Sequence, residues 1–266
     1  MISFLIVLSI VSVFFYGFGT KALIPVMIAV LTTTILDLFI EYFKSKTWAF
    51  PQSALISGLL IGGLLTQDLK WHIYVLAGII AIASKHIIRF NQKHVFNPAN
   101  LGVLLVSIIF GAAHSWWISS PLILVLIFGI FLIWRLKRID LAVSFLASYY
   151  LINSIVELLK GNSFNDVYST IINGGIIFFF SMYMLIEPKT NPSQKNQRII
   201  CGILVAILFI IFSQYPSFYK NTLSTFFEDH SLPLALAIGN VFVVALNKMK
   251  LEFKGKEETK PNIYKE

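Results

Sequence analysis

"FNPANLGVLLVSIIF", residues 96–110, joins a polar Asn-Pro element to an uninterrupted apolar run. Apolar and polar residues do not alternate along this run, as they do along the strands of a membrane barrel. Asn97 is suited to cap a helix, and Pro98 to occupy its first turn, where no backbone N–H is needed. The stretch therefore predicts an apolar helix that begins at a polar hinge.

The same continuous apolar character extends through most of the chain. Of the 266 residues, 57% are hydrophobic and 13% are charged, so the apolar content exceeds what the core of a soluble domain requires. Because only helices and closed barrels satisfy their backbone in a bilayer, we predict an all-α, polytopic transmembrane helical bundle. Its ten candidate spans are residues 1–18, 22–40, 54–65, 71–88, 98–110, 116–134, 141–159, 171–186, 199–212 and 232–246.

The distribution of basic residues predicts how this bundle lies in the membrane. We expect a single transmembrane domain, residues 1–246, and a charged cytoplasmic tail, residues 247–266, that is solvated and disordered. If the N-terminus is cytoplasmic and every segment crosses, seventeen Lys and Arg residues lie inside and four outside: Lys21, Lys70, Lys160 and Lys220. We therefore predict a multi-pass protein of the plasma (inner) membrane with both termini in the cytoplasm. The formal net charge of +8 then follows from topology and gives no reason to expect nucleic-acid binding.

A second Asn-Pro pair indicates an internal duplication. Asn97-Pro98 and Asn191-Pro192 lie 94 residues apart, and this offset places the second to fifth apolar segments on the sixth to ninth. We predict repeats at residues 21–111 and 115–205. Four spans in each unit would make the repeats parallel, whereas a five-plus-five division would make them inverted, and the sequence leaves both open.

Both pairs lie beside basic residues, in "KHVFNPANLG" (residues 93–102) and "MLIEPKTNPSQ" (residues 184–194). We name residues 96–99 the first hinge and residues 187–192 the second hinge. Each pair is able to open a helix whose free amides attract anions such as phosphate, and Lys93, Lys189 and Arg198 add positive charge nearby. One interpretation is that the hinges form a single anion or flavin site; the alternative is that each is an ordinary helix cap.

Three stretches resemble, in order, the RnfD/NqrB family of membrane subunits. They are "SALISGLLIGGLL" (53–65), "GIIAIASKHIIRFNQKHVFNPANLGVLL" (78–105) and "MLIEPKTNPSQKNQRIICG" (184–202). The resemblance covers roughly residues 50–212. It implies a ten-helix subunit, with a urea-transporter-like fold, of ion-pumping, flavin-dependent electron-transport complexes. The family's F-N-P-A element matches Phe96, Asn97, Pro98 and Ala99, and its D-P-x-[ST]-x-P element matches Glu187, Pro188, Lys189, Thr190 and Pro192, with Glu187 in place of Asp.

One family element is missing from this chain. The family's S-G-A-T element, whose threonine carries covalently attached flavin mononucleotide (FMN), has no counterpart, and Thr170 lacks the small-residue context. The resemblance therefore implies that a flavin, FMN or riboflavin, is held non-covalently. Its candidate contacts are Phe96, Asn97, Pro98, Glu187, Lys189, Thr190, Asn191 and Pro192.

Acidic and amide residues inside the predicted spans are candidates for an ion path. Asp37 lies three residues from the cytoplasmic end of its segment, so we expect its side chain to reach the interface, the alternative being an ion path or a buried partner. Asn153 and Glu157 share one helical face and are further ion-path candidates. Gly58, Gly62 and Gly63 predict close helix packing, or else a segment that lines a site.

No catalytic or metal-binding residue is predicted. The five histidines show no i, i+4 ligand spacing on one span, and the single cysteine, Cys201, supports neither an internal disulfide nor an iron–sulfur cluster held by this chain alone. No Ser-His-Asp arrangement or phosphate-gripping Gly-Lys-Ser/Thr loop is present.

The function that we expect is that of an integral membrane subunit of a flavin-linked electron-transport complex that couples redox chemistry to cation transport. Its partners would be the lipid membrane and other membrane redox subunits. Two alternatives remain. One is a solute channel or transporter of the same fold without redox activity, and the other is a membrane anchor subunit without a cofactor.

Overall fold

The computed structural model of the chain describes residues 1–165, 174–218 and 222–258. Within these ranges it is an all-α bundle with one two-stranded hairpin, which confirms the predicted fold class. The helices are α1 (Ile2–Phe15), α2 (Leu23–Ser45), α3 (Gln52–Leu64), α4 (Trp71–Ile87), α5 (Pro98–Phe110), α6 (Leu122–Arg135), α7 (Ile139–Leu159), α9 (Gly175–Phe179), α10 (Lys195–Phe218) and α11 (Thr222–Glu258). Short 3₁₀ turns, η1 (Thr20–Ala22) and η2 (Trp117–Ser119), precede α2 and α6, and a π-helical turn, η3 (Phe180–Met184), continues α9.

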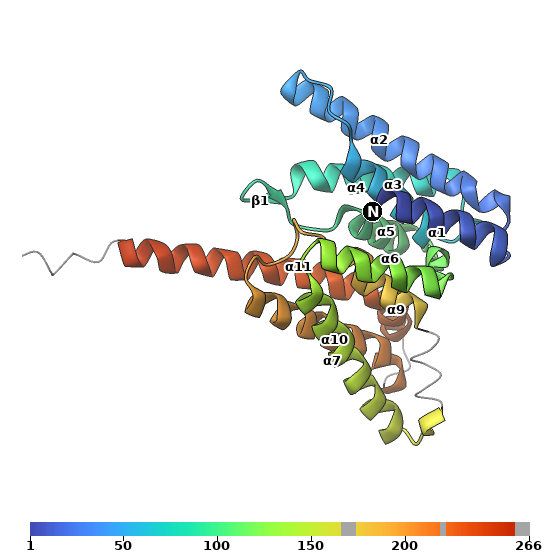
Figure 1. The fold of residues 1–266 in the computed structure, drawn as a ribbon, viewed down its shortest axis with the longest axis vertical. Coiled ribbons are helices and arrows are strands. Elements are labelled where there is room, and N and C mark those ends of the chain that lie inside the picture. Colours follow the sequence, from blue (N-terminus) through green and yellow to red (C-terminus); the bar gives the residue numbers. More distant parts are fainter. Residues whose placement is uncertain (166–173, 219–221, 259–266) are drawn as a thin grey trace, which may run out of the picture.

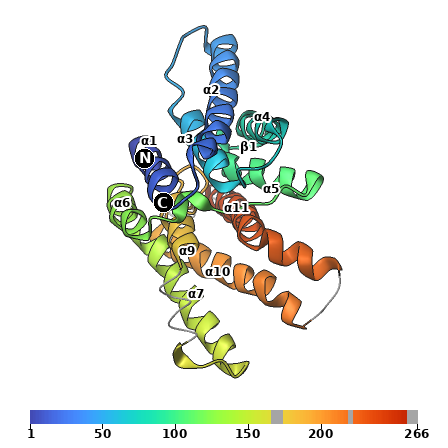
Figure 2. The ribbon, with the colours of Figure 1, turned by 90° about the vertical axis from the view of Figure 1, so that its right-hand side faces the viewer.

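The two halves of the chain occupy different sides of the molecule. Helices α1–α5 lie on one side and α6–α11 on the other, with α2 and α7 at opposite edges in both views (Figures 1 and 2). In the first half α4 packs against α2 and α5, and in the second half α10 packs against α7 and α11. Contacts of α11 with α5 and of α6 with α1 join the halves. This pairing follows the five-plus-five division; the boundaries of the repeats at 21–111 and 115–205 stay a prediction.

The helices differ in length in a way that bears on the site. Four of them include segments long and apolar enough to cross a membrane, namely Thr20–Ser45, Ile139–Leu159, Lys195–Gln214 and Thr225–Lys248. By contrast, α3 and α5 have 13 residues each, which at 1.5 Å per residue is roughly 20 Å, short of the roughly 30 Å of hydrocarbon. Both are largely buried among other helices. The polar start of α5, at Asn97 and Pro98, therefore lies against protein, where its backbone groups need protein partners.

Glycines allow α3 to lie close to its neighbours. A Cβ atom added to Gly58 or Gly62 would come within 2.5 Å of a backbone Cα atom of α2, that of Val30 or Val26. The third glycine, Gly63, faces the Ile118 side chain in the same way, at 2.8 Å. These contacts support close packing as the reason for the glycine pattern.

Connections at one end of the bundle converge on a small volume. Met1, Ser53, Asn97, Leu136 and Glu187, from five segments far apart in sequence, line one cavity. The segments with the predicted cytoplasmic Lys and Arg residues thus gather at one end. At the other end the backbone of Thr66 donates a hydrogen bond to the Ala113 carbonyl (3.1 Å).

The expected disorder of the tail is wrong for its first part. Helix α11 continues without interruption to Glu258, beyond the span that ends near Lys248 (Figure 1). The segment from 247 to 258 has no proline and is rich in Lys and Glu, which favour helix strongly enough to prolong a helix that packing has already nucleated. The last eight residues lie outside the described part of the chain.

Single cysteines introduced at the two ends should label from opposite sides of the membrane. We expect a membrane-impermeant maleimide to modify Lys21→Cys and Lys70→Cys in intact cells, and Lys46→Cys and Lys195→Cys only after permeabilisation, because the four lysines are exposed at the two different ends. The wild-type chain is a matched blank, since its Cys201 is buried. Labelling of both pairs from the same side would contradict the topology.

Candidate functional site

A short hairpin positions the residues just before the first hinge. Strands β1 (Arg89–Phe90) and β2 (Lys93–His94) pair antiparallel through a two-residue turn in which Asn91 and Gln92 have positive φ angles of 48° and 63°. Such a turn matches the twist of a hairpin, and asparagine tolerates the left-handed conformation well. The hairpin turns the chain at the end of α4 and buries the His94 side chain.

The first hinge is a helix cap, as its sequence predicts. The Asn97 Oδ1 atom accepts a hydrogen bond from the Asn100 backbone N–H (3.1 Å), and Pro98 occupies the first turn of α5. The Asn97 backbone N–H donates to Asn240 Oδ1 on α11 (3.2 Å), and the Asn97 Nδ2 group donates to the Met184 carbonyl (3.3 Å). One asparagine thus ties together α5, α11 and the end of η3.

The second hinge does not open a helix, and the expectation that Asn191 caps one is wrong. Helix α10 begins only at Lys195. The Asn191 Nδ2 group instead donates to the carbonyls of Leu185 (2.5 Å) and Glu187 (2.9 Å). These carbonyls follow the π-helical turn, where the helical hydrogen-bond pattern stops, and the Glu187 carbonyl also accepts from the Thr190 backbone N–H (3.3 Å). Asn191 therefore completes the end of one helix and does not start the next.

The two hinges line one cavity, and each contacts a residue next to the other hinge. His94 Nε2 is 2.8 Å from Glu187 Oε1, and the His94 side chain is only 3% exposed. Together with the hydrogen bond from Asn97 to the Met184 carbonyl, this contact joins the segment before α5 to the segment after η3. Residues that are about 90 positions apart in sequence therefore share one site.

A cavity of about 250 Å³ lies between the hinges. Its walls are mainly apolar, with Ile56, Leu60 and Ile186 among the lining residues, and its polar groups include Asn97, Glu187 and Lys189. The Glu187 Oε2 atom is buried and has no hydrogen-bond partner among the described residues. A buried carboxylate oxygen without a donor is costly, so an N–H or O–H group of a ligand or of water would stabilise this atom.

The amide groups at the start of α5 are less available to an anion than the sequence suggests. Pro98 has no N–H group, and the Asn100 amide is already bonded to the Asn97 side chain. The Leu101 amide donates to the Asn97 carbonyl (3.0 Å). A site built on helix amides alone is therefore not formed here, and Glu187 favours a ligand that brings donors of its own.

The remaining predicted residues of the hinges lie around this cavity. Lys189 lines it and also two neighbouring cavities, of about 310 and 410 Å³. Thr190 lies on the wall of the 310 Å³ cavity with Lys93 and His94, and its hydroxyl donates to the Glu187 carbonyl (3.3 Å). Phe96 is half-buried and Pro192 is buried, but neither lines these three cavities.

Asp37 does not reach the membrane interface, and that expectation is wrong. Its side chain is 2% exposed, and both carboxylate oxygens lie 2.7 Å from the Lys85 ammonium. His86 Nε2 is 2.8 Å from Asp37 Oδ1. Lys85 also donates to Ser53 Oγ (2.7 Å). The alternative of a buried partner is therefore the one observed. Lys85 and His86 of α4 stabilise the Asp37 carboxylate inside the protein, so its side chain does not extend to the membrane interface.

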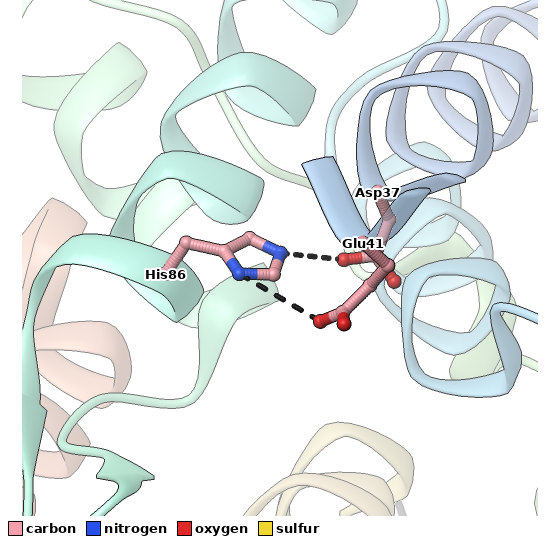
Figure 3. A group of neighbouring side chains, drawn as sticks. All are labelled: Asp37, Glu41 and His86. Atoms are coloured by element: carbon pink, nitrogen blue, oxygen red, sulfur yellow. Dashed lines mark hydrogen bonds and ion pairs between the residues drawn. The ribbon is translucent and has the colours of Figure 1, made fainter. Parts of the chain in front are cut away.

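Asp37, Glu41 and His86 are close enough together to be considered as metal ligands (Figure 3). Two ammonium groups already contact this cluster. Lys85 pairs with Asp37, and Lys44 Nζ lies 3.0 Å from His86 Nδ1. With two carboxylates and two ammonium groups the charges balance, so a divalent cation would have to displace Lys85. The arrangement fits an ion-pair network that joins α2 to α4 better than a metal centre.

The other two ion-path candidates lie elsewhere. Asn153 Oδ1 and Glu157 Oε1, on α7, both accept hydrogen bonds from Gln214 Nε2 of α10 (3.3 and 3.1 Å). Glu157 also pairs with Lys160 (3.4 Å) at the end of α7. Since α2 and α7 lie at opposite edges of the molecule (Figures 1 and 2), the structure does not bring this pair together with Asp37.

Three residues important to the site were not predicted: His94, Lys85 and Asn240. Asn240 is buried in the last span, and a single amide inside an apolar helix is itself a signal that a polar partner lies nearby.

The chain matches a protein-family profile, described as the NQR2, RnfD, RnfE family, over residues 1–122 and 119–224. The chain belongs to this family. The resemblance seen in the two hinges is thus confirmed, and membership identifies the chain as a membrane subunit of the Rnf/Nqr type. Subunits of this family work within multi-subunit membrane complexes. Among curated proteins, no sequence matches the chain.

Removing one partner of the Asp37–Lys85 pair should destabilise this membrane subunit more than removing both. We expect Asp37→Ala or Lys85→Met alone to cost about 3–5 kcal/mol, because each leaves a buried charge without its partner. The double variant should recover part of the loss. Thermal unfolding in detergent would rank the three variants, and Asp68→Asn, which changes an exposed carboxylate outside this network, is a control. Losses that simply add in the double variant would contradict a coupled buried pair.

Proposed function

We propose that this subunit binds a non-covalent flavin between its two hinges and takes part in electron transfer coupled to cation movement. The observation that carries the proposal is that both hinges line one cavity, in which one oxygen of Glu187 pairs with His94 and the other has no partner among the described residues. In the family that the chain resembles, the same two elements accompany flavin chemistry. Here they meet in space.

The lining of the hinge cavity suits a flat, largely apolar ring with polar edges. Apolar side chains cover most of the wall, while Glu187 and Lys189 supply an acceptor and a positive charge. Glu187 Oε2 would accept a ring N–H, and Lys189 would pair with a ring carbonyl or a phosphate group. A bound flavin would supply one- and two-electron transfer; the chain's own residues bind and orient it and limit the access of water.

The proposed coupling to cation movement is supported by one charged residue, Lys189, that borders two neighbouring cavities. Lys189 lines the hinge cavity and also the 410 Å³ cavity whose wall includes Asp37 and Lys85. Charges separated by low-dielectric protein interact strongly. A change of charge in the hinge cavity would therefore alter the energy of a cation near Asp37.

Covalent attachment is not part of the proposal. The family's threonine element has no counterpart in this sequence. Thr170, which lacks the small-residue context of that element, lies outside the described residues. The flavin would be held by contacts of the hinge residues alone.

The wild-type subunit, purified with its partner subunits or alone, should retain FMN or riboflavin that is released on denaturation. Its absorbance should show the flavin bands, and a denaturing gel under ultraviolet light should show no fluorescent protein band. Glu187→Gln should weaken flavin binding by about tenfold to a hundredfold, because a charge-assisted hydrogen bond is worth about 1.5–3 kcal/mol.

A matched control is Glu41→Gln, an exposed carboxylate outside the hinge cavity, which should leave flavin binding unchanged. Saturable uptake of a small solute into proteoliposomes, without flavin in either preparation, would contradict the redox function and favour the transporter alternative. A fluorescent band that survives denaturation would contradict non-covalent binding.

A further inference from the structure

A wide groove of about 840 Å³ lies at the hinge end of the molecule, between α6, α7 and α10. Its walls are apolar side chains of α7 and α10, including Val143, Ala147 and Ile199. Arg135, Lys137 and Lys195 also line the groove. It is separate from the hinge cavity, with which it shares no lining residue.

The three basic residues of this groove are free to bind an anion. Arg135, Lys137 and Lys195 are exposed, and none of them forms an ion pair within the described part of the chain. The acid in the groove, Asp140, is already engaged by Arg198, whose Nη2 atom lies 2.6 Å from Asp140 Oδ2. The groove therefore has a net positive charge that no group among the described residues neutralises.

The basic residues lie where a membrane-spanning helix meets water. Arg135 is the last residue of α6, Lys195 is the first residue of α10, and Lys137 lies in the turn between α6 and α7. Trp134, beside them, is 63% exposed, as is usual for tryptophan at the level of lipid headgroups. The apolar wall continues from these residues along α7, so positive charge lies at one end of the groove and apolar surface extends from it.

We propose that this groove binds an anionic phospholipid. Its phosphate would pair with Arg135, Lys137 and Lys195, and one acyl chain would lie along Val143 and Ala147. Basic pockets between membrane helices at the cytoplasmic side suit such headgroups. A free phosphate would not contact the apolar walls of the groove. An apolar helix of a partner protein would provide no negative charge for the three basic residues.

Bound lipid would also affect the second hinge. Lys195 follows that hinge by three residues, and Arg198, on the next turn of α10, donates to the Ser193 carbonyl (2.6 Å). A headgroup on Lys195 would thereby restrain the segment between Pro192 and α10. This inference does not depend on flavin binding.

The test is competitive retention of lipid by the full chain in detergent, measured by native mass spectrometry with phosphatidylglycerol and phosphatidylcholine of the same acyl chains. We expect phosphatidylglycerol to bind at least about tenfold more tightly. Lys137→Gln combined with Lys195→Gln should remove most of this preference, because each surface basic residue contributes a comparable factor. Lys46→Gln combined with Lys248→Gln, two exposed lysines away from the groove, should leave it unchanged.

A second variant tests the apolar wall without a change of charge. Ala147 is exposed in the groove, so Ala147→Phe should fold normally and weaken phosphatidylglycerol binding at least about threefold by filling the space for the acyl chain. Equal retention of the two lipids would overturn the proposal, as would a preference that the lysine variants leave intact. Full competition by soluble glycerol phosphate, with no effect of Ala147→Phe, would show a simple anion site instead of a lipid site.

Discussion

The side chain and backbone of Asn97 hold together the part of the protein on which the candidate site depends. Helix α5 is too short to cross a bilayer and starts among other helices, so the polar groups at its start cannot reach water. Asn97 caps the helix and bonds to Asn240 of α11 and to the Met184 carbonyl. Because unpaired backbone groups are costly in such surroundings, the positions of α5, η3 and α11 are linked, and the hinge cavity forms where they meet.

The same constraint explains the charged residues inside the bundle. Asp37 is stabilised by Lys85 and His86, and Glu187 by His94, each through contacts with another segment. In both cases the pairing joins two elements, so it fixes their relative position as well as satisfying the charge. The difference is that Asp37 is fully partnered, whereas Glu187 keeps one oxygen free. A structural role accounts for Asp37, while the unpartnered oxygen of Glu187 is the group on which the proposed ligand binding rests.

Three of the cavities at the hinge end of the bundle have Lys189 in common. It borders the hinge cavity, the cavity beside Asp37 and the cavity beside His94. A long flexible ammonium group at such a junction is able to respond to charge in any of the three. This arrangement gives a physical reason why binding at the hinges and the energy of a nearby cation would be coupled in a membrane subunit of the Rnf/Nqr type.

The sequence by itself determined the features that depend on local chemistry. Continuous apolar runs predicted the helices, Asn97-Pro98 predicted the cap of α5, and the ordered motifs predicted the family. Local patterns did not reveal that Asn191 completes the end of η3 or that Asp37 is buried against Lys85, because both depend on partners brought close by folding. Only the tertiary structure decided that the hinges share one cavity, since the sequence left open a shared site or two separate caps, and the contact between His94 and Glu187 forms only when the chain folds.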